Sequence, residues 1–436
     1  MTQIELPETV SGRRISNRGV HLQPFGHHRD WLNRASYWVE LLQSMHMSWV
    51  VLLTDGDAVR QEHYGLNPLR VLLDGGIIPI IREQKQFPYP FTEHDTFRWT
   101  VDLYGEYGLK PFWIIRNEPF DGREWAKNWS DKHTREEQWE RIMTVWANAA
   151  NFIASNGGIV GFPDGPCYDF NPFDSIKAYD CQWIFDEGKG FYAGHHYGKG
   201  RPPDYPYDHV TRYGTQLTEH EYRLLLDDYA DDPAWHDLPL DWINEARTRL
   251  ANPTLTALED DTCWRGWEKV AHWSNQSFGY VVPMAMTEGG WVPRDRAGSG
   301  PDTDVRWPHT TPRQVAVKTL QMFESSSPFF AICPWLVACG GMGGVGWEDD
   351  AWVGGSFMDR YGYEKPVVQV LQDNPPGELE PEPTPEPIPL PEPEPEPAPP
   401  TDNWALLLEK LARIEELVGR LPVTAERHGH GEREGE

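Results

Sequence analysis

Two glutamates, Glu118 and Glu288, follow apolar runs and stand about 170 residues apart in the sequence. Glu118 lies in the tripeptide Asn-Glu-Pro (117–119) after the run at 112–115, and Glu288 follows the run at 281–286. Each carboxyl group is therefore expected where a buried strand meets a loop. Two acids delivered in this way suit the hydrolysis of a glycosidic bond, because one protonates the leaving oxygen while the other attacks or stabilises the sugar cation.

The elements that must position these acids are predicted to be alternating strands and helices. Short, nearly all-apolar runs with strand character occur at 19–23, 49–53, 77–81, 112–115, 159–162, 192–196, 281–286 and 329–332. Stretches with helical spacing occur at 31–43, 68–73, 96–107, 134–154 and 312–323. Strands that are apolar on both faces and alternate with helices are typical of a covered parallel sheet. Eight units in about 360 residues predict an α/β protein with a (β/α)8 or TIM barrel. The main alternative is a doubly wound sheet, which usually needs fewer strands.

Polar and aromatic side chains occur at the ends of most predicted strands. They include His21, Arg82, Glu118, the triplet at 195–197, Glu288 and Trp335. In a closed barrel the C-terminal strand ends converge on one face, where enzymes of this fold place their chemistry. We therefore expect these side chains to share one site.

The order of these motifs resembles a known group of enzymes. Asn-Glu-Pro ends the fourth predicted strand, His195-x-Tyr197 the sixth, a lone Glu288 the seventh and Trp335 the eighth. Over about residues 15–370 this pattern is similar to the clan of retaining (β/α)8 glycoside hydrolases that includes the cellulase and mannanase families (family 5-like). The resemblance implies that Glu118 is the general acid/base and Glu288 the nucleophile. It also implies a polysaccharide or oligosaccharide substrate with β-linkages, and we expect endo action.

Further roles follow from the resemblance alone. Asn117 would hydrogen-bond the 2-hydroxyl of the reacting sugar, Tyr197 would hold Glu288, and Trp335 would form the platform beneath that sugar. Families of this clan often carry an arginine near the second strand, where this chain has Thr-Asp-Gly-Asp (54–57). Arg82, after the third predicted strand, is the candidate to replace it. The full set of residues expected to bind substrate is Asn117, His195, His196, Tyr197, Trp335, Arg82, Trp291 and His21.

Other functions are compatible with parts of the same pattern. The two glutamates could be structural ion-pair partners in a carbohydrate-binding protein that has no turnover. A metal-dependent barrel hydrolase could use His21, His27 or His195, although we expect neither a metal nor a cofactor. The motif Gly-x-Gly-x-x-Gly at 341–346 is followed by acidic residues that would repel a pyrophosphate, so it predicts a loop rather than a nucleotide site. Trp347 and Trp352 are, with Trp291, candidates to line a sugar subsite.

The composition disfavours some classes of binding partner. The formal net charge is −28, which disfavours nucleic acids and anionic membranes. The 21 tryptophans suit the stacking of flat sugar faces. The five cysteines are widely spaced and contain no Cys-x-x-Cys pair, so they predict neither a disulfide framework nor a zinc site. No Sec signal pattern or membrane span is visible, and we expect a soluble protein, whether cytoplasmic, released or associated with a phage particle that attacks cell-wall or capsule glycan.

The chain divides into four predicted parts. Residues 1–376 form the barrel, with a helical insertion at 199–275 between the sixth and seventh strands. Residues 377–400 alternate Pro with Glu and predict an extended linker. Residues 401–422 predict a short coiled-coil helix, because apolar residues recur at Leu407, Leu411, Ile414, Val418 and Leu421. Such a helix favours a homo-oligomer, with docking onto another protein as the alternative, and 423–436 predict a disordered tail.

Overall fold

The structure, a computed structural model, is a barrel of parallel strands. It describes residues 4–23, 31–127, 129–163, 171–227, 239–291, 304–307, 312–325, 328–335, 337, 357 and 364–377. Residues 1–377 form one compact unit. The predicted linker beyond Gly377, the predicted coiled-coil helix and the tail lie outside the described residues, as do His27, Trp347, Trp352 and the glycine motif at 341–346.

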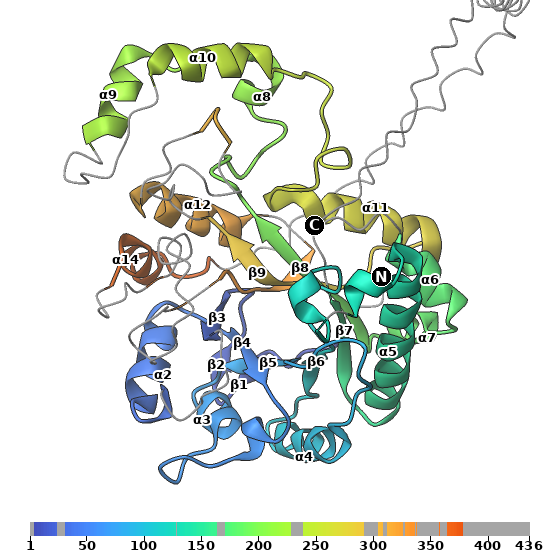
Figure 1. Ribbon diagram of the computed structural model, residues 1–436. Helices are drawn as coiled ribbons and strands as arrows, with labels where there is room; N and C mark the ends of the chain where they lie inside the picture. Colours follow the sequence, from blue (N-terminus) through green and yellow to red (C-terminus); the bar gives the residue numbers. More distant parts are fainter. Residues whose placement is uncertain are drawn as a thin grey trace, which may run out of the picture. The chain divides into compact units, whose positions relative to one another are not determined.

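Eight strands form a single parallel sheet, in the order β10-β9-β8-β7-β6-β5-β4-β3. They are β3 (Gly19–Gln23), β4 (Trp49–Thr54), β5 (Ile78–Glu83), β6 (Phe112–Ile114), β7 (Ile159–Pro163), β8 (Gly190–Tyr197), β9 (Met284–Gly290) and β10 (Phe329–Ile332). The first and last strands also meet, since the Ile332 N–H donates to Asn17 O at 2.8 Å and the His21 N–H to Pro334 O at 3.0 Å. The predicted (β/α)8 barrel is confirmed (Figure 1).

The strands are buried on both faces, as their apolar sequences predict. Every residue of β4, β5, β7 and β9 is buried, because side chains of one face fill the barrel and those of the other pack against helices. Five strands, β4, β5, β7, β8 and β9, extend further than their apolar runs, and in two of them the extension contains a charged residue of interest. Arg82 lies within β5 and Glu288 within β9, so both belong to the rigid sheet rather than to the loops that follow it.

Helices surround the barrel (Figure 1). They are α2 (Ala35–Ser44), α3 (Pro68–Asp74), α4 (His94–Gly105), α5 (Arg135–Ser155), α6 (Pro172–Ala178), α7 (Gln182–Asp186), α11 (Trp267–Phe278), α12 (Pro312–Glu324) and α14 (Pro366–Asp373). Some of these helices begin at a side-chain cap. The Asn67 side chain accepts from the Leu69 and Arg70 N–H groups and caps α3, and Thr134 with Glu137 forms a capping box at α5.

The predicted insertion between the sixth and seventh strands is helical. It contains α8 (His209–Tyr213), α9 (Glu219–Asp227), α10 (Leu240–Arg249) and the 3-10 turn η4 (Trp264–Gly266), and it leads into α11. Arg201, at its start, donates to Asp304 Oδ2 at 3.0 Å and pairs with Asp260 at 3.2 Å. The contact with Asp304 fastens the insertion to the segment that follows β9, and the contact with Asp260 lies within the insertion.

Smaller elements complete the described chain. The hairpin β1 (Thr9–Val10) and β2 (Arg13–Arg14) precedes the barrel, and Arg13 donates to the carbonyls of Met47 and Gly75. Three 3-10 turns, η1 (Ala58–Arg60), η2 (Gly122–Glu124) and η3 (Ser130–Lys132), lie in strand-to-helix loops.

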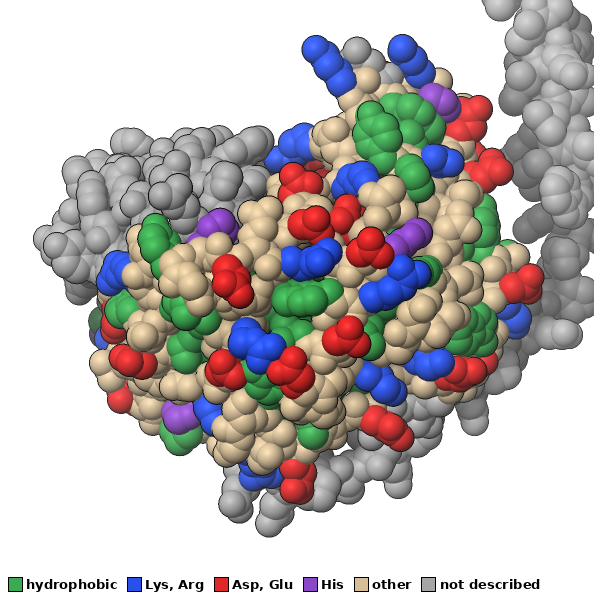
Figure 2. Space-filling model, turned by 90° about the horizontal axis from the view of Figure 1, so that it is seen from below, with side chains coloured by type: hydrophobic (Ala, Val, Ile, Leu, Met, Phe, Trp, Pro, Cys, Tyr) green, Lys and Arg blue, Asp and Glu red, His purple; other side chains and the backbone are tan. Residues whose placement is uncertain are grey.

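No described helix combines the length and apolar character needed to cross a bilayer. Of the cysteines, Cys181, Cys263 and Cys333 are free thiols and buried. Acidic and basic side chains are interspersed over the described face in Figure 2.

Candidate active site

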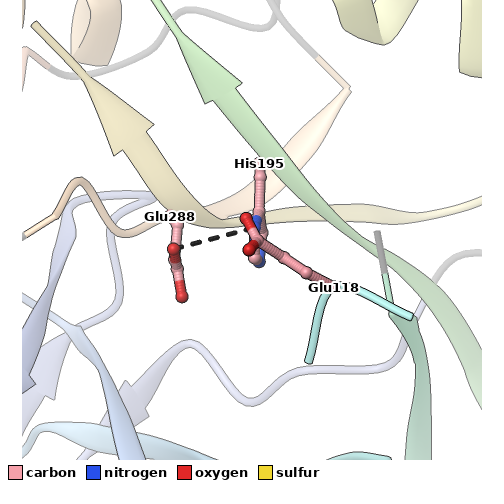
Figure 3. Close-up of side chains that lie close together, drawn as sticks. All are labelled: Glu118, His195 and Glu288. Atoms are coloured by element: carbon pink, nitrogen blue, oxygen red, sulfur yellow. Dashed lines mark hydrogen bonds and ion pairs between the residues drawn. The ribbon is translucent and has the colours of Figure 1, made fainter. Parts of the chain in front are cut away.

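Three ionisable side chains from separate strand ends meet at one point. Glu118 follows β6, His195 lies in β8 and Glu288 in β9, and Figure 3 shows the three side chains converging. One ligand-type atom from each residue lies within 4.8 Å of the other two. The two glutamates, about 170 residues apart in the sequence, are therefore within a few ångströms of each other.

Glu118 is positioned by a strained turn after β6. Arg116 has a φ of +73°, a conformation that residues with a Cβ rarely adopt. Its guanidinium pairs with the carboxylate of Glu83, the last residue of β5, and both side chains are buried. Arg116 also donates to Tyr89 O at 2.7 Å. This ion pair fastens the backbone at 116, so the next two residues project over the barrel mouth. Glu83 and Arg116 follow predicted strands in the sequence, but no sequence pattern indicates that they pair.

Glu288 is positioned by a register shift and two glycines. The pairing of β8 with β9 shifts between Gly194 and His195, and His195 then lies opposite Glu288. Gly289 has a φ of +138° and its Cβ, if present, would lie 2.2 Å from His196 O. Only glycine fits at that close approach. The strand end is therefore shaped to bring the imidazole and the carboxylate side by side.

Glu288 is held as a carboxylate. Arg82 pairs with its Oε1, and the Tyr197 hydroxyl donates to its Oε2 at 2.8 Å. Burial raises the pKa of Glu288, but the charges of His195 and Arg82 outweigh this and lower its pKa to about 2. The predicted contact of Tyr197 with Glu288 is present in the structure, and Arg82 in β5 is the cation that pairs with this carboxylate.

His195 bridges the two acids. Its Nδ1 lies 3.0 Å from Glu118 Oε1 and 3.7 Å from Glu288 Oε2, so this nitrogen carries a proton in the neutral as well as the charged ring. Burial lowers the pKa of His195, but Glu288 and the hydrogen bond to Glu118 more than compensate and raise it.

Asn117 joins the same network. Arg82 Nη1 donates to Asn117 Oδ1 at 2.9 Å, and Asn117 Nδ2 donates to Glu124 Oε1 at 2.9 Å. Burial raises the pKa of Glu124, which lies in η2. Glu124 lies in a loop that no apolar run directly precedes, so no sequence pattern marks it as a site residue.

His21 and Trp335 lie together beside this group. Their ring centroids are 4.4 Å apart with planes inclined by 53°. His21 is fully buried in β3, and its ring nitrogens have no hydrogen-bond partner among the described residues. Burial, followed by the Arg82 charge, lowers the pKa of His21 well below the ordinary value. The Trp335 N–H donates to Gly289 O at 3.0 Å, which ties the predicted platform to the end of β9.

Two residues expected to bind substrate point elsewhere. His196 alternates with its neighbours along β8, so its ring packs in the helix layer, 5.5 Å from the Phe329 ring and 6.4 Å from Trp264. Trp291 is buried against Trp264, and its indole N–H donates to Arg201 O at 2.7 Å. The structure does not bring either side chain into contact with the group around Glu288.

The cluster of Glu118, His195 and Glu288 offers metal-ligand atoms, but its surroundings oppose a cation. Arg82 already neutralises Glu288 at one oxygen, and Tyr197 donates to the other. A divalent ion would have to displace this guanidinium from a buried carboxylate. The donor set therefore fits acid–base and nucleophilic chemistry better than a metal centre.

Comparison with known proteins gives similarity of structure and none of sequence. No protein-family model matches the chain, and no curated protein sequence is significantly similar to it. Similar solved structures include the GH39 enzyme from Xanthomonas axonopodis pv. citri, with a TM-score of 0.45 and 13% identity over 82% of this chain and 65% of that one. A monomeric β-xylosidase from Caulobacter crescentus CB15 gives 0.46 and 13%, over 84% and 69% of the two chains. A β-mannanase from Thermomonospora fusca, in complex with mannohexaose, gives 0.37 and 10%, over 83% and 90%. The chain thus spans just under two thirds of the first of these proteins. The likeness concerns the fold, and the substrates in those names belong to those proteins.

Proposed function

We propose that this protein is a glycoside hydrolase that cleaves β-linked glycans with retention of anomeric configuration. Glu118 is the general acid/base and Glu288 is the nucleophile. The observation that carries the proposal is the pairing of two acids within a few ångströms in unlike surroundings, since Glu288 is held ionised by Arg82 while Glu118 contacts an imidazole.

The short separation supports retention. Carboxyl groups about 5–5.5 Å apart allow the second acid to attack the sugar directly, whereas inverting enzymes need about 6.5–9.5 Å to admit a water molecule. One carboxylate oxygen of Glu118 and one of Glu288 lie within 4.8 Å of each other, which is closer to the separation in retaining enzymes than to that in inverting enzymes.

The reaction follows from these roles in two displacements. In the first, a carboxylate oxygen of Glu288 forms a bond to the anomeric carbon while the bond to the leaving oxygen breaks and Glu118 gives that oxygen its proton. In the second, the Glu118 carboxylate takes a proton from water, whose oxygen displaces Glu288. Arg82 and Tyr197 stabilise the Glu288 carboxylate when it leaves.

Fewer observations support the substrate class than support the two catalytic acids. Trp335 beside His21 supports an aromatic platform for a sugar ring, as at many carbohydrate sites. We include a polysaccharide or oligosaccharide substrate and endo action in the proposal, and the length distribution of products from a panel of β-glucans, mannans, xylan and peptidoglycan tests both.

The decisive experiment replaces each acid separately. Glu118→Gln and Glu288→Gln are each expected to reduce sugar release by several orders of magnitude, with products of the wild type showing retained anomeric configuration by NMR. Glu106→Gln, at the exposed end of α4, is the matched control and should leave activity unchanged. If neither site variant reduces turnover, Glu118 and Glu288 are not the catalytic acids and the proposal fails. If the wild type itself releases no sugar, a carbohydrate-binding protein becomes the better account.

We also propose that residues 401–422 form a coiled coil that joins copies of the chain through the Pro/Glu linker. Charged substitutions at Leu411 and Ile414 in the full chain should then convert the oligomer to a monomer in light scattering. A wild-type protein that is monomeric at micromolar concentration contradicts this proposal.

A further inference from the structure

We propose that Glu124 is a positioning residue of this site, which fixes the side-chain amide of Asn117 and thereby connects the Glu118 loop to the Arg82–Glu288 pair. The kinetic consequence rests on the proposed glycosidase function, whereas the structural consequence does not. Glu124 itself lies in η2, outside the motifs by which the sequence suggested the site.

The orientation of the Asn117 amide is determined at both ends by charge. A guanidinium can only donate, so the atom 2.9 Å from Arg82 Nη1 must be the amide oxygen. A carboxylate can only accept, so the atom 2.9 Å from Glu124 Oε1 must be the amide nitrogen. Both contacts are charge-assisted and therefore stronger than hydrogen bonds between neutral groups. Neither end tolerates the flipped amide.

The loop that carries Glu124 is itself anchored. The backbone carbonyl of Glu124 accepts from the Phe87 N–H at 2.8 Å, and the Ala126 N–H donates to Phe87 O at 2.6 Å. The Trp125 indole donates to Pro119 O at 2.8 Å, which fastens the loop to the residue after Glu118. The backbone that carries Glu124 is therefore fixed, and its carboxylate is held as an acceptor for Asn117.

These contacts form a continuous series from Glu124 through Asn117, Arg82 and Glu288 to Tyr197. If the acceptor at 124 becomes an amide, it can donate to Asn117 Oδ1 and stabilise the flipped orientation. The Asn117 amino group would then face the Arg82 guanidinium, donor against donor. Arg82 would move from its place between Asn117 and Glu288, and the nucleophile would move with it.

Glu124 also titrates within a charged group. It shares the site with Glu118, Glu288 and Arg82, and Arg123 is its neighbour on the same turn. Burial is the main cause that raises the pKa of Glu124, and the Glu118 charge adds to it. The hold on Asn117 is therefore strongest when Glu124 is ionised, and it weakens as the pH falls through this raised pKa.

The test uses selectively 15N-asparagine-labelled full-length protein and the matched variant Glu124→Gln. The Asn117 side-chain amide signals, assigned by their loss in Asn117→Asp, should move with pH in the wild type and lose this titration in Glu124→Gln. No titration in the wild type, or the same titration in the variant, overturns the inference, and this readout requires no enzymatic activity.

Steady-state kinetics provide a second test of the role of Glu124. Glu124→Gln should lower kcat by about 10- to 100-fold, as misplacement of a reacting group does, with a smaller change in KM. Glu106→Gln is the control for loss of an exposed carboxylate. If the wild type is active and Glu124→Gln has the same kcat at every pH, the inference fails while the glycosidase proposal stands. If the wild type cleaves no glycan, the glycosidase proposal fails and the amide titration alone decides the inference.

Discussion

Replacing Arg82 by Met tests how the protein keeps Glu288 charged. The guanidinium is buried, pairs with Glu288 Oε1, and donates to Thr287 O at 3.1 Å and to Asn117. Met has a similar apolar stem without the charge. The variant therefore leaves a carboxylate that is only 6% exposed without its cation.

The magnitude follows from the lowered pKa. A carboxyl whose pKa falls from 4.5 to about 2 on folding contributes about 3 kcal/mol at neutral pH. Arg82 supplies a large part of this, and breaking a buried pair from one side generally costs about 3–5 kcal/mol. We expect Arg82→Met to lower the free energy of unfolding by about 3 kcal/mol at pH 7. Because the folded pKa of Glu288 is lowered, this stability is present above the unfolded value and is lost as pH falls toward 2, so the deficit of the variant should shrink below about pH 4.5.

Denaturant unfolding of wild type and variant at pH 7 and pH 4, followed by tryptophan fluorescence, measures this difference. Arg70→Met removes the cation from an exposed pair with Glu106 and should change stability little at either pH. The double variant Arg82→Met/Glu288→Gln should recover much of the loss, since no buried charge then remains. Equal stability of Arg82→Met and wild type at pH 7, or a deficit that does not change between the two pH values, would refute the reasoning.

Three further predictions concern the same framework. Tyr197→Phe removes a hydrogen bond to a charged group, worth about 1.5–3 kcal/mol, and should lower kcat by about 10- to 100-fold without unfolding the protein, as steady-state kinetics and circular dichroism will report. Gly289→Ala places a methyl group against His196 O at a φ of +138°, so it should lower both the melting temperature and the activity; an unchanged melting temperature would contradict the role given to this strand end. Thr134→Ala removes the capping box of α5 and should cost about 1 kcal/mol in denaturant unfolding while kcat stays the same, since the capping hydrogen bonds join Thr134 to Glu137 and not to the acids of the site.

The barrel could be predicted because its signals are local. Each strand is a short apolar run, and two of them, β3 and β10, have the predicted bounds. The predicted strand ends are less accurate for β5 and β9, which carry charged residues of the site. The apolar runs at 77–81 and 281–286 end before Arg82 and Glu288, so the sequence assigned these charged residues to loops, whereas partners across the barrel keep both within strands.

The site could be predicted only where a motif marks it. Glu118, Glu288, His195 and Tyr197 meet as their strand-end positions suggested. His196 faces the helices, which the two-residue alternation of a strand already implies once His195 faces inward. The Glu83–Arg116 pair and Glu124 were missed for another reason. Their partners are distant in sequence or lie across a loop, and a single charged residue carries no periodic signal of where its partner will be.

The most direct test of the central claim is to trap the covalent intermediate. Aryl β-glycosides with a good leaving group need little acid assistance, so Glu118→Gln should form the glycosyl-enzyme and hydrolyse it slowly. Intact mass and peptide mapping after incubation with 2,4-dinitrophenyl β-glucoside, β-mannoside and β-xyloside should show one added sugar on the peptide that contains Glu288, and none in Glu288→Gln. A sugar attached elsewhere, or turnover of these substrates with inverted configuration and no adduct, would contradict the assignment of Glu288 as the nucleophile.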